Sequence, residues 1–423
     1  MKQLWLLLLP LFCLPDLLFS QETSVGVLKW TDYLIGPYLL SIASAGGFST
    51  KDRRLRPLTV LLFVFGFCAL VSTLTISLRY GYRSDYFTRL GLAKLAKFGL
   101  YAAAGIGTLR VILTSPELRI RLRWSILASL LTVSISVYTS ATVLNDLPGS
   151  PREAGFRYEA TNAVSVLMSM LLAFLLGEWG ERTTHVAWRN AGVVLLPAIV
   201  MGFFLTGGRG GWIGLLLALA YVLVNAGLKP SFVLGGFVLI AIGAVVYTQN
   251  PSFSHHVDIT LNPALLAEET AFARATGFDD GNRVTILINE SAKLVRSPIF
   301  GSGLFHRGAA SGLYPTGSHN FFLQMLLETG LVGGGAIIAY FYRLWRTGRG
   351  QVIVGARPQL GSRAAMVAAV AGGLSGEYFY GGPTLLMLHV LIAPALAFGA
   401  TAATAAPTLP QPISARMRLQ RHA

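Results

Sequence analysis

The chain has 423 residues, of which 53% are hydrophobic and only 13% are charged. Soluble domains carry about 25% charged residues, so this composition excludes a single water-soluble core and favours a membrane protein. The net charge is +15, but the basic residues lie mostly in short loops between apolar runs. We therefore interpret the positive charge first as a signal of membrane topology and not of nucleic-acid binding. Cys13 and Cys68 both fall inside apolar runs, which excludes a disulfide framework or a cysteine metal cluster.

Apolar runs long enough to cross a bilayer recur along the whole chain. A helix needs about 20 apolar residues to span the hydrocarbon core. Residues 1–20 suit either a signal peptide or a first span, and Asp16 and Leu18 make a poor cleavage region, which favours an uncleaved helix. The predicted fold is an all-α polytopic membrane protein with about 12 transmembrane helices. The spans are predicted near 3–20, 27–47, 57–78, 91–113, 124–144, 161–177, 191–206, 211–227, 231–247, 319–342, 364–380 and 384–401.

The charge of the connecting segments predicts the orientation. With the N-terminus in the cytoplasm, the basic segments 51–56, 119–123, 343–363 and 416–421 are all cytoplasmic, whereas the segment 145–162 on the opposite side is nearly charge-balanced. This is the expected excess of positive charge on the inner side. Both termini are therefore predicted to be cytoplasmic.

One outer segment carries more positive charge than this rule expects. Arg79, Arg83 and Arg89 lie outside, and Lys94 and Lys97 follow in the outer half of the next span. These side chains either extend to the headgroups as ordinary interfacial cations or form a patch that binds an anionic lipid or phosphorylated glycan.

The largest extramembrane feature is the outer loop 248–317. It is far longer than an ordinary connection, and such loops are usually functional or disordered. Helical character at 262–275 and a second helix at 283–296, preceded by Asp279 and Asp280 and ended by Ser297-Pro298, predict a partly helical loop. The predicted organisation is therefore spans 1–9 in 1–247, this loop, spans 10–12 in 318–402, and a basic cytoplasmic tail in 403–423.

A glycine-rich turn at 206–212, Thr-Gly-Gly-Arg-Gly-Gly-Trp, connects two spans on the outer side. Glycines let backbone N–H groups approach an anion closely, and Arg209 supplies a permanently charged planar fork. The turn suits an anion site, although its arginine would equally serve as an interfacial anchor.

Two further polar residues lie within the outer loop and just after its end. Arg283 opens the second loop helix, where an arginine would strengthen the anion preference of a helix N-terminus, unless it pairs with the preceding aspartates. His319 stands where the loop re-enters the membrane and could exchange a proton near neutral pH or simply cap the helix. Glu328, next to a glycine turn, is expected to bind backbone or an arginine within the bundle.

Together these motifs resemble the O-antigen ligase and polysaccharide polymerase superfamily of bacterial inner-membrane proteins. The resemblance rests on the Gly-Arg-Gly turn, on Asn282-Arg283, on Ser297-Pro298-Ile299-Phe300-Gly301-Ser302-Gly303, and on His319-Asn320 with Glu328 and Gly330 downstream. It covers about 200–345 in motifs and the whole chain in span count.

The resemblance implies a metal-independent, inverting glycosyltransferase that uses an undecaprenyl-diphosphate-linked glycan in the periplasm. By motif match the essential arginines are Arg209 and Arg283 and the essential histidine is His319, with Asn320 beside it in the substrate site. The implied ligase transfers O-antigen to lipid A–core during lipopolysaccharide biosynthesis and needs no cofactor or nucleic acid. Zinc, Walker and dinucleotide signatures do not occur in the sequence.

Other functions are weighed against the ligase. A polymerase would move the glycan onto another lipid-linked repeat unit, and a protein O-oligosaccharyltransferase would carry a longer C-terminal part. The compact chain and the basic outer segment favour a ligase. A transporter or flippase would place ionisable residues at mid-membrane and broken helices in paired positions, which the sequence does not suggest.

Overall fold

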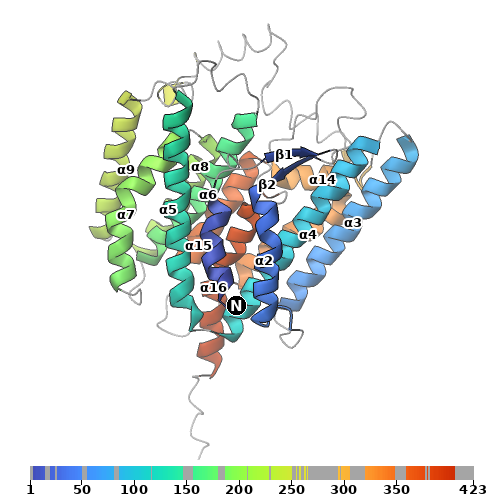
Figure 1. Cartoon of the computed structure of the whole chain (residues 1–423), viewed down its shortest axis with the longest axis horizontal. Helices are drawn as coiled ribbons and strands as arrows, with labels where there is room; N and C mark the ends of the chain where they lie inside the picture. Colours follow the sequence, from blue (N-terminus) through green and yellow to red (C-terminus); the bar gives the residue numbers. More distant parts are fainter. Residues whose placement is uncertain are drawn as a thin grey trace, which may run out of the picture.

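The protein is a bundle of long apolar helices, seen in a computed structural model (Figure 1). The structure describes residues 3–14, 20–23, 26–49, 55–80, 85–115, 117–145, 156–179, 186–206, 208–227, 230–249, 297–304, 320–347, 359–376 and 382–404, with single residues between 254 and 295 and Phe379.

Each predicted span has a helical counterpart. In the first half of the chain these are α1 (Leu4–Leu8) with the 3₁₀ helix η1 (Leu9–Cys13), α2 (Trp30–Ser44), α3 (Arg56–Tyr80), α4 (Asp85–Thr114), α5 (Leu118–Asn145) and α6 (Phe156–Trp179). In the second half they are α7 (Val186–Leu205), α8 (Arg209–Ala226), α9 (Pro230–Gln249), α14 (Phe321–Thr347), α15 (Leu360–Ser375) and α16 (Pro383–Thr404).

The helices carry the composition of membrane spans. Within the described residues, five of them are long and apolar enough to cross a bilayer, namely those containing Arg56–Thr75, Thr88–Thr114, Leu118–Tyr138, Val186–Leu205 and Phe321–Arg346. Six further apolar helices are shorter. A polytopic helical membrane protein is therefore confirmed. The full number of spans stays a prediction.

The prediction is wrong at the beginning of the chain. The 3₁₀ helix ends at Cys13 instead of residue 20, because Leu14 is extended, with φ −70° and ψ 141°. Leu14 precedes Pro15 in the sequence, and a residue before proline disfavours the helical conformation. Strands β1 (Ser20–Thr23) and β2 (Gly26–Lys29) then form an antiparallel ribbon, so that α2 begins at Trp30 rather than at residue 27. The ribbon lies beside α2 at the upper end of the bundle in Figure 1.

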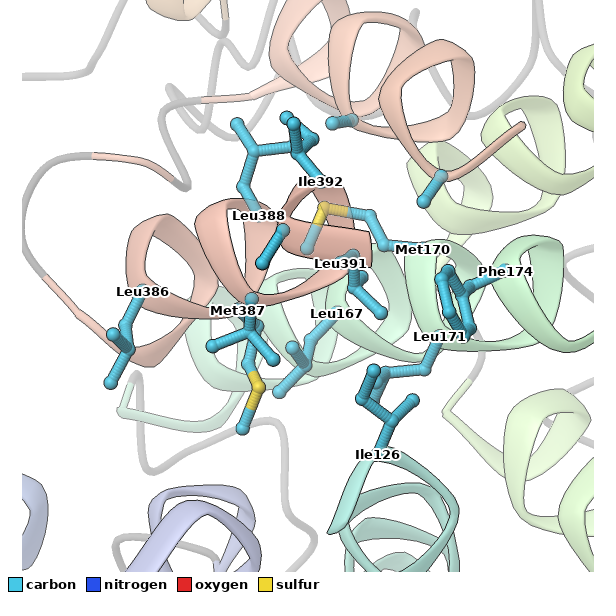
Figure 2. Packing of buried hydrophobic residues seen from close by; sticks show 14 of the residues in the cluster. Ile126, Leu167, Met170, Leu171, Phe174, Leu386, Met387, Leu388, Leu391 and Ile392 are labelled. Carbon is cyan, nitrogen blue, oxygen red and sulfur yellow. The ribbon is translucent and has the colours of Figure 1, made fainter. Parts of the chain in front are cut away.

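Helix α6 forms the centre of the bundle. Its residues 165–179 are all buried, as expected of a helix that other helices cover on every side. Figure 2 shows Leu167, Met170, Leu171 and Phe174 of α6 facing Leu388 and Leu391 of α16, with Ile126 of α5 nearby. The core that positions the remaining helices is therefore built around α6.

Small residues allow α15 to pack closely against α6 and α8. A Cβ added to Gly177 would lie 2.6 Å from Cα of Gly361, and one added to Gly214 would lie 3.0 Å from the Ala368 carbonyl oxygen. Close backbone approach through small residues is typical of helix association in membranes. In contrast, α3 exposes apolar side chains such as Phe63 and Leu78 on its outer face, as a lipid-facing helix does.

Candidate functional site

The glycine-rich turn is a tight connection between α7 and α8. Helix α8 begins at Arg209, and its N-cap residue, Gly208, provides no side-chain cap. The Ser165 hydroxyl of α6 donates a 2.8 Å hydrogen bond to the Gly208 carbonyl. A Cβ on Gly211 would lie 2.5 Å from the Ser165 carbonyl oxygen. The turn therefore lies directly on α6, which fixes the backbone of Arg209; the arginine side chain is outside the described part of the structure.

The second candidate region is the beginning of α14. The Asn320 carboxamide oxygen accepts a 3.0 Å hydrogen bond from the Leu323 amide, and the Asn320 carbonyl accepts 2.9 Å from the Gln324 amide. Asn320 is thus the N-cap of α14, which gives it a structural role in addition to the predicted place in the substrate site. His319 directly precedes this cap and lies outside the described residues, as does Arg283.

The two helix beginnings, of α8 and of α14, lie at the same end of the bundle, joined through α6 and α15. The turn before α8 contacts Ser165, and the next residue of α6, Val166, touches Gly372 near the end of α15. A Cβ on the neighbouring Gly373 would lie 3.2 Å from Cε2 of Phe322, in the first turn of α14. The backbone of Arg209 and the residue after His319 are therefore linked by one continuous set of contacts.

An aromatic cluster holds the beginning of α14 in place. Phe321 and Phe322 lie edge-on to one another with ring centroids 5.5 Å apart, and Phe321 also packs on Phe379 at 5.4 Å, between α15 and α16. Phe341, 20 residues further along α14, returns to this cluster and lies 5.9 Å from Phe321 and 5.4 Å from Phe379 between ring centroids. Such edge-on ring pairs add roughly 0.5–1.5 kcal/mol each to area burial. This cluster fixes the point where the chain leaves His319.

Glu328 is a structural residue, as its motif suggests. It is fully buried in α14, where the Gln324 carboxamide donates to its Oε1 and its backbone carbonyl accepts 2.7 Å from Ser72 of α3. The sequence did not identify Gln324 as its partner. The spacing of four residues, which places two side chains on one helix face, is the signal that could have found it.

The basic outer segment is only partly described. The side chains of Arg79 and Arg83 are outside the described part, Arg89 is exposed, and Lys94 is half-buried. The Lys97 ammonium lies 2.7 Å from both carboxylate oxygens of Asp32 in α2. Lys97 therefore has an internal counter-ion.

A buried histidine in the middle of α16 was not recognised from the sequence. His389 is fully buried, its Nδ1 lies 2.7 Å from the Leu385 carbonyl, and its Nε2 bonds the Tyr340 hydroxyl of α14. A Cβ on Gly105 of α4 would lie 2.5 Å from its Nδ1. Both ring nitrogens have partners, so His389 fits a neutral contact joining three helices. Its signal was one ionisable residue within an otherwise apolar run.

No group of three or more His, Cys, Asp or Glu side chains that could bind a metal occurs among the residues that the structure describes. Of the acidic side chains that are described, Asp32 pairs with Lys97 and Glu178 with Arg123, whereas Asp258 accepts from the Tyr247 hydroxyl and Glu328 from the Gln324 carboxamide.

Residues 191–338 match the family model described as O-antigen ligase. The match begins in α7, contains Arg209, the outer loop with Arg283, and His319, and ends in α14. No curated protein and no solved structure matched the chain. The resemblance to the O-antigen ligase superfamily is thereby confirmed, over the segment that carries all three predicted site residues.

Proposed function

Since residues 191–338 of this membrane protein match the O-antigen ligase family, we propose that the chain is an O-antigen ligase. It transfers an O-antigen glycan from undecaprenyl diphosphate to lipid A–core, in the periplasmic leaflet of a bacterial inner membrane, during lipopolysaccharide biosynthesis. The observation that carries this proposal is that one family match contains Arg209, Arg283 and His319.

The backbone arrangement supports a shared site. The turn before α8 and the cap of α14 lie at one end of the bundle, joined through Ser165 and Gly373. The first and last helices, α1 and α16, begin and end at the other end in Figure 1. With both termini cytoplasmic, as the charge of the loops predicts, Arg209 and His319 face the periplasm.

In the proposed reaction, a hydroxyl oxygen of lipid A–core attacks the anomeric carbon of the donor glycan. The bond between this carbon and the diphosphate oxygen breaks on the opposite face, which inverts the configuration. His319 takes the proton of the attacking hydroxyl, and undecaprenyl diphosphate leaves with its bonding electron pair.

The leaving diphosphate gains negative charge in this step. Arg209 and Arg283 would bind it through paired N–H groups, a geometry that suits phosphate oxygens. Arg209 is also the first residue of α8, whose uncapped N-terminus favours an anion. Fixed positive groups of this kind stabilise developing charge without reorganising, which allows a reaction that needs no metal.

Transfer in vitro tests this function. Purified donor, lipid A–core and protein are incubated with EDTA, and the ligated product is separated by gel electrophoresis. Wild type should form product, whereas Arg209→Ala, Arg283→Ala and His319→Ala should each lose it. Arg346→Ala, which removes an exposed arginine from the last turn of α14, is the matched control. Activity in all three site variants would contradict the proposed site. Dependence on added divalent metal would contradict the metal-independent mechanism.

A polymerase is the alternative, because the superfamily contains both activities. Deletion in the native bacterium separates the two. A strain lacking a ligase accumulates polymerised lipid-linked glycan, whereas a strain lacking a polymerase makes only single repeats. A transporter or flippase is less favoured, because ionisable side chains described within the bundle have internal partners: His389 bonds Leu385 and Tyr340, Glu328 bonds Gln324, and Glu178 pairs with Arg123.

A further inference from the structure

Helix α14 is broken ten residues after its cap. Gly330 adopts φ 70° and ψ −174°, which no helix allows. Since an α-helix rises 1.5 Å per residue, the break lies roughly 15 Å along α14 from Asn320. A broken helix in a membrane is tolerated only where other groups bond the freed backbone, so the partners of this break are informative.

The partner is the segment 297–304, which we name the docking segment. The Leu331 amide donates to the Pro298 carbonyl at 2.8 Å. In return, the Leu327 carbonyl accepts from the Ser302 amide at 2.8 Å, and the Glu328 carbonyl from the Gly303 amide at 3.0 Å. The groups freed by the break are therefore bonded by a segment that belongs to the outer loop.

Two glycines make this approach possible. A Cβ on Gly301, which has φ 73°, would lie 2.5 Å from the Gly330 nitrogen. A Cβ on Gly330 would lie 2.6 Å from the Phe300 nitrogen and closer still to the Ile299 carbonyl. Each glycine is thus required both by its backbone conformation and by the space beside it.

Helices α3 and α4 also contact the docking segment. The Thr73 hydroxyl accepts 3.2 Å from the Leu304 amide, and the Ser72 hydroxyl donates 2.7 Å to the Glu328 carbonyl. A Cβ on Gly91 of α4 would lie 2.9 Å from the Leu304 carbonyl oxygen. The segment is therefore fixed between three helices rather than resting on one.

The docking segment lies between the two proposed site residues of the loop. Arg283 precedes it by 14 residues, and His319 follows it by 15 residues. His319 also precedes the cap of the same helix that the segment joins. We propose that Gly301 and Gly330 are positioning residues for glycan transfer. By docking the segment to the break in α14, they hold in place the stretches of chain before and after it, which carry Arg283 and His319. This inference rests on the proposed function.

Distance measurements test the docking itself. Val295, just before the docking segment, and Tyr342, in the part of α14 after the break, are exposed, and the two native cysteines, Cys13 and Cys68, are buried. Spin labels on cysteines introduced at 295 and 342 should give a narrow distance distribution in the full-length protein. Gly330→Ala and Gly301→Ala should broaden it and reduce kcat for transfer roughly 10- to 100-fold, the scale of a misplacement of about 1 Å.

Two other glycines of α14 are controls. Gly335→Ala adds a Cβ where nothing lies within 4 Å, and it should change neither the distance distribution nor kcat. Gly333→Ala would place its Cβ 2.5 Å from Oγ1 of Thr329 and 2.9 Å from Cβ of Cys68, rather than against the docking segment. This variant should lose thermal stability without broadening the distribution. It therefore separates weakened helix packing from lost docking.

The outcomes are distinct. A narrow distribution in variants that lose activity, or a broad distribution with wild-type kcat, overturns the positioning role. If Gly330→Ala and Gly301→Ala do not fold, the double variant Ser72→Ala/Ser302→Ala, which removes hydrogen bonds to the Glu328 and Leu327 carbonyls, is read by the same two measurements. If the wild type transfers no glycan, both the proposed function and the positioning role are overturned. If the wild type is active and the variants are unaffected, only the positioning role is overturned.

Discussion

Arg123 of α5 and Glu178 of α6 form an ion pair of 2.7 Å inside the bundle, with side chains only 10% and 0% exposed. The Arg123 carbonyl also accepts 2.9 Å from the indole N–H of Trp188 in α7, so three helices meet at this pair. Glu178 follows Ser165, which contacts the turn before Arg209, by 13 residues of helix, roughly 20 Å. The pair therefore bears on stability at the end of the bundle away from the proposed site.

We expect the loss of either partner of this pair to destabilise the protein strongly. Arg123→Ala and Glu178→Ala each leave one buried charge without its partner, at a cost of about 3–5 kcal/mol. Denaturant unfolding in detergent micelles measures this cost. The double variant should lose less than the sum of the two single variants, because it leaves no isolated charge. Strictly additive losses would show that the pair is not coupled.

Arg209→Lys should lose most of the transfer activity although it keeps the positive charge. A lysine ammonium cannot make the paired planar contact of a guanidinium, and the loss of one fixed charge-stabilising contact costs about 100- to 1,000-fold in kcat. Initial rates of product formation measure the effect, with Arg346→Lys as the control. Wild-type rates for Arg209→Lys would show that charge alone suffices at this position.

Gly211→Ala should reduce transfer by displacing the beginning of α8. Its Cβ would lie 2.5 Å from the Ser165 carbonyl oxygen, in contact with backbone that cannot rotate away. Rates should fall at least 10-fold, since the reacting groups tolerate little displacement. Gly236→Ala in α9 adds a Cβ where nothing lies within 4 Å and should behave as wild type. Equal rates for the two variants would contradict a site at this turn.

We expect Arg89 and Lys97 of α4 to have different roles, the first in acceptor binding and the second in stability. Arg89 is exposed, so Arg89→Glu should raise KM for lipid A–core several-fold while KM for the donor stays unchanged. Lys97→Glu would instead place two carboxylates where Lys97 now bonds Asp32, which should lower thermal stability. The swap Asp32→Lys/Lys97→Asp should recover that stability. Equal effects of Arg89→Glu on both substrates would contradict an acceptor patch.

The succession of spans followed from hydrophobicity, because lipid requires every spanning segment to be apolar and helical. Helices α3 to α9 begin and end within six residues of their predicted ranges for this reason. The ribbon of β1 and β2 did not follow, because four-residue strands depend on their pairing rather than on composition. The break at Gly330 is also tertiary in origin, since it depends on the docking segment.

The residues of the candidate site were proposed from the sequence and stay a prediction, whereas the contacts that support the site could not be predicted. Arg209 and His319 stand out as polar groups at the ends of apolar runs, and the family match contains both. The contacts that bring α8 and α14 to one end of the bundle depend on small residues such as Gly372 and Gly373, whose partners the sequence does not reveal. Similarly, the Tyr340–His389 contact joins residues 49 positions apart.

The break in α14 has a consequence for biogenesis. The docking segment is synthesised before α14, so with the predicted topology it has already been translocated when the 27 residues of α14 leave the ribosome. The docking segment can therefore bond the interrupted backbone of α14 at the outer leaflet as the helix inserts. If the docking segment followed α14 in the chain, α14 would enter lipid with the Leu327 and Glu328 carbonyl groups lacking the bonds that the segment provides.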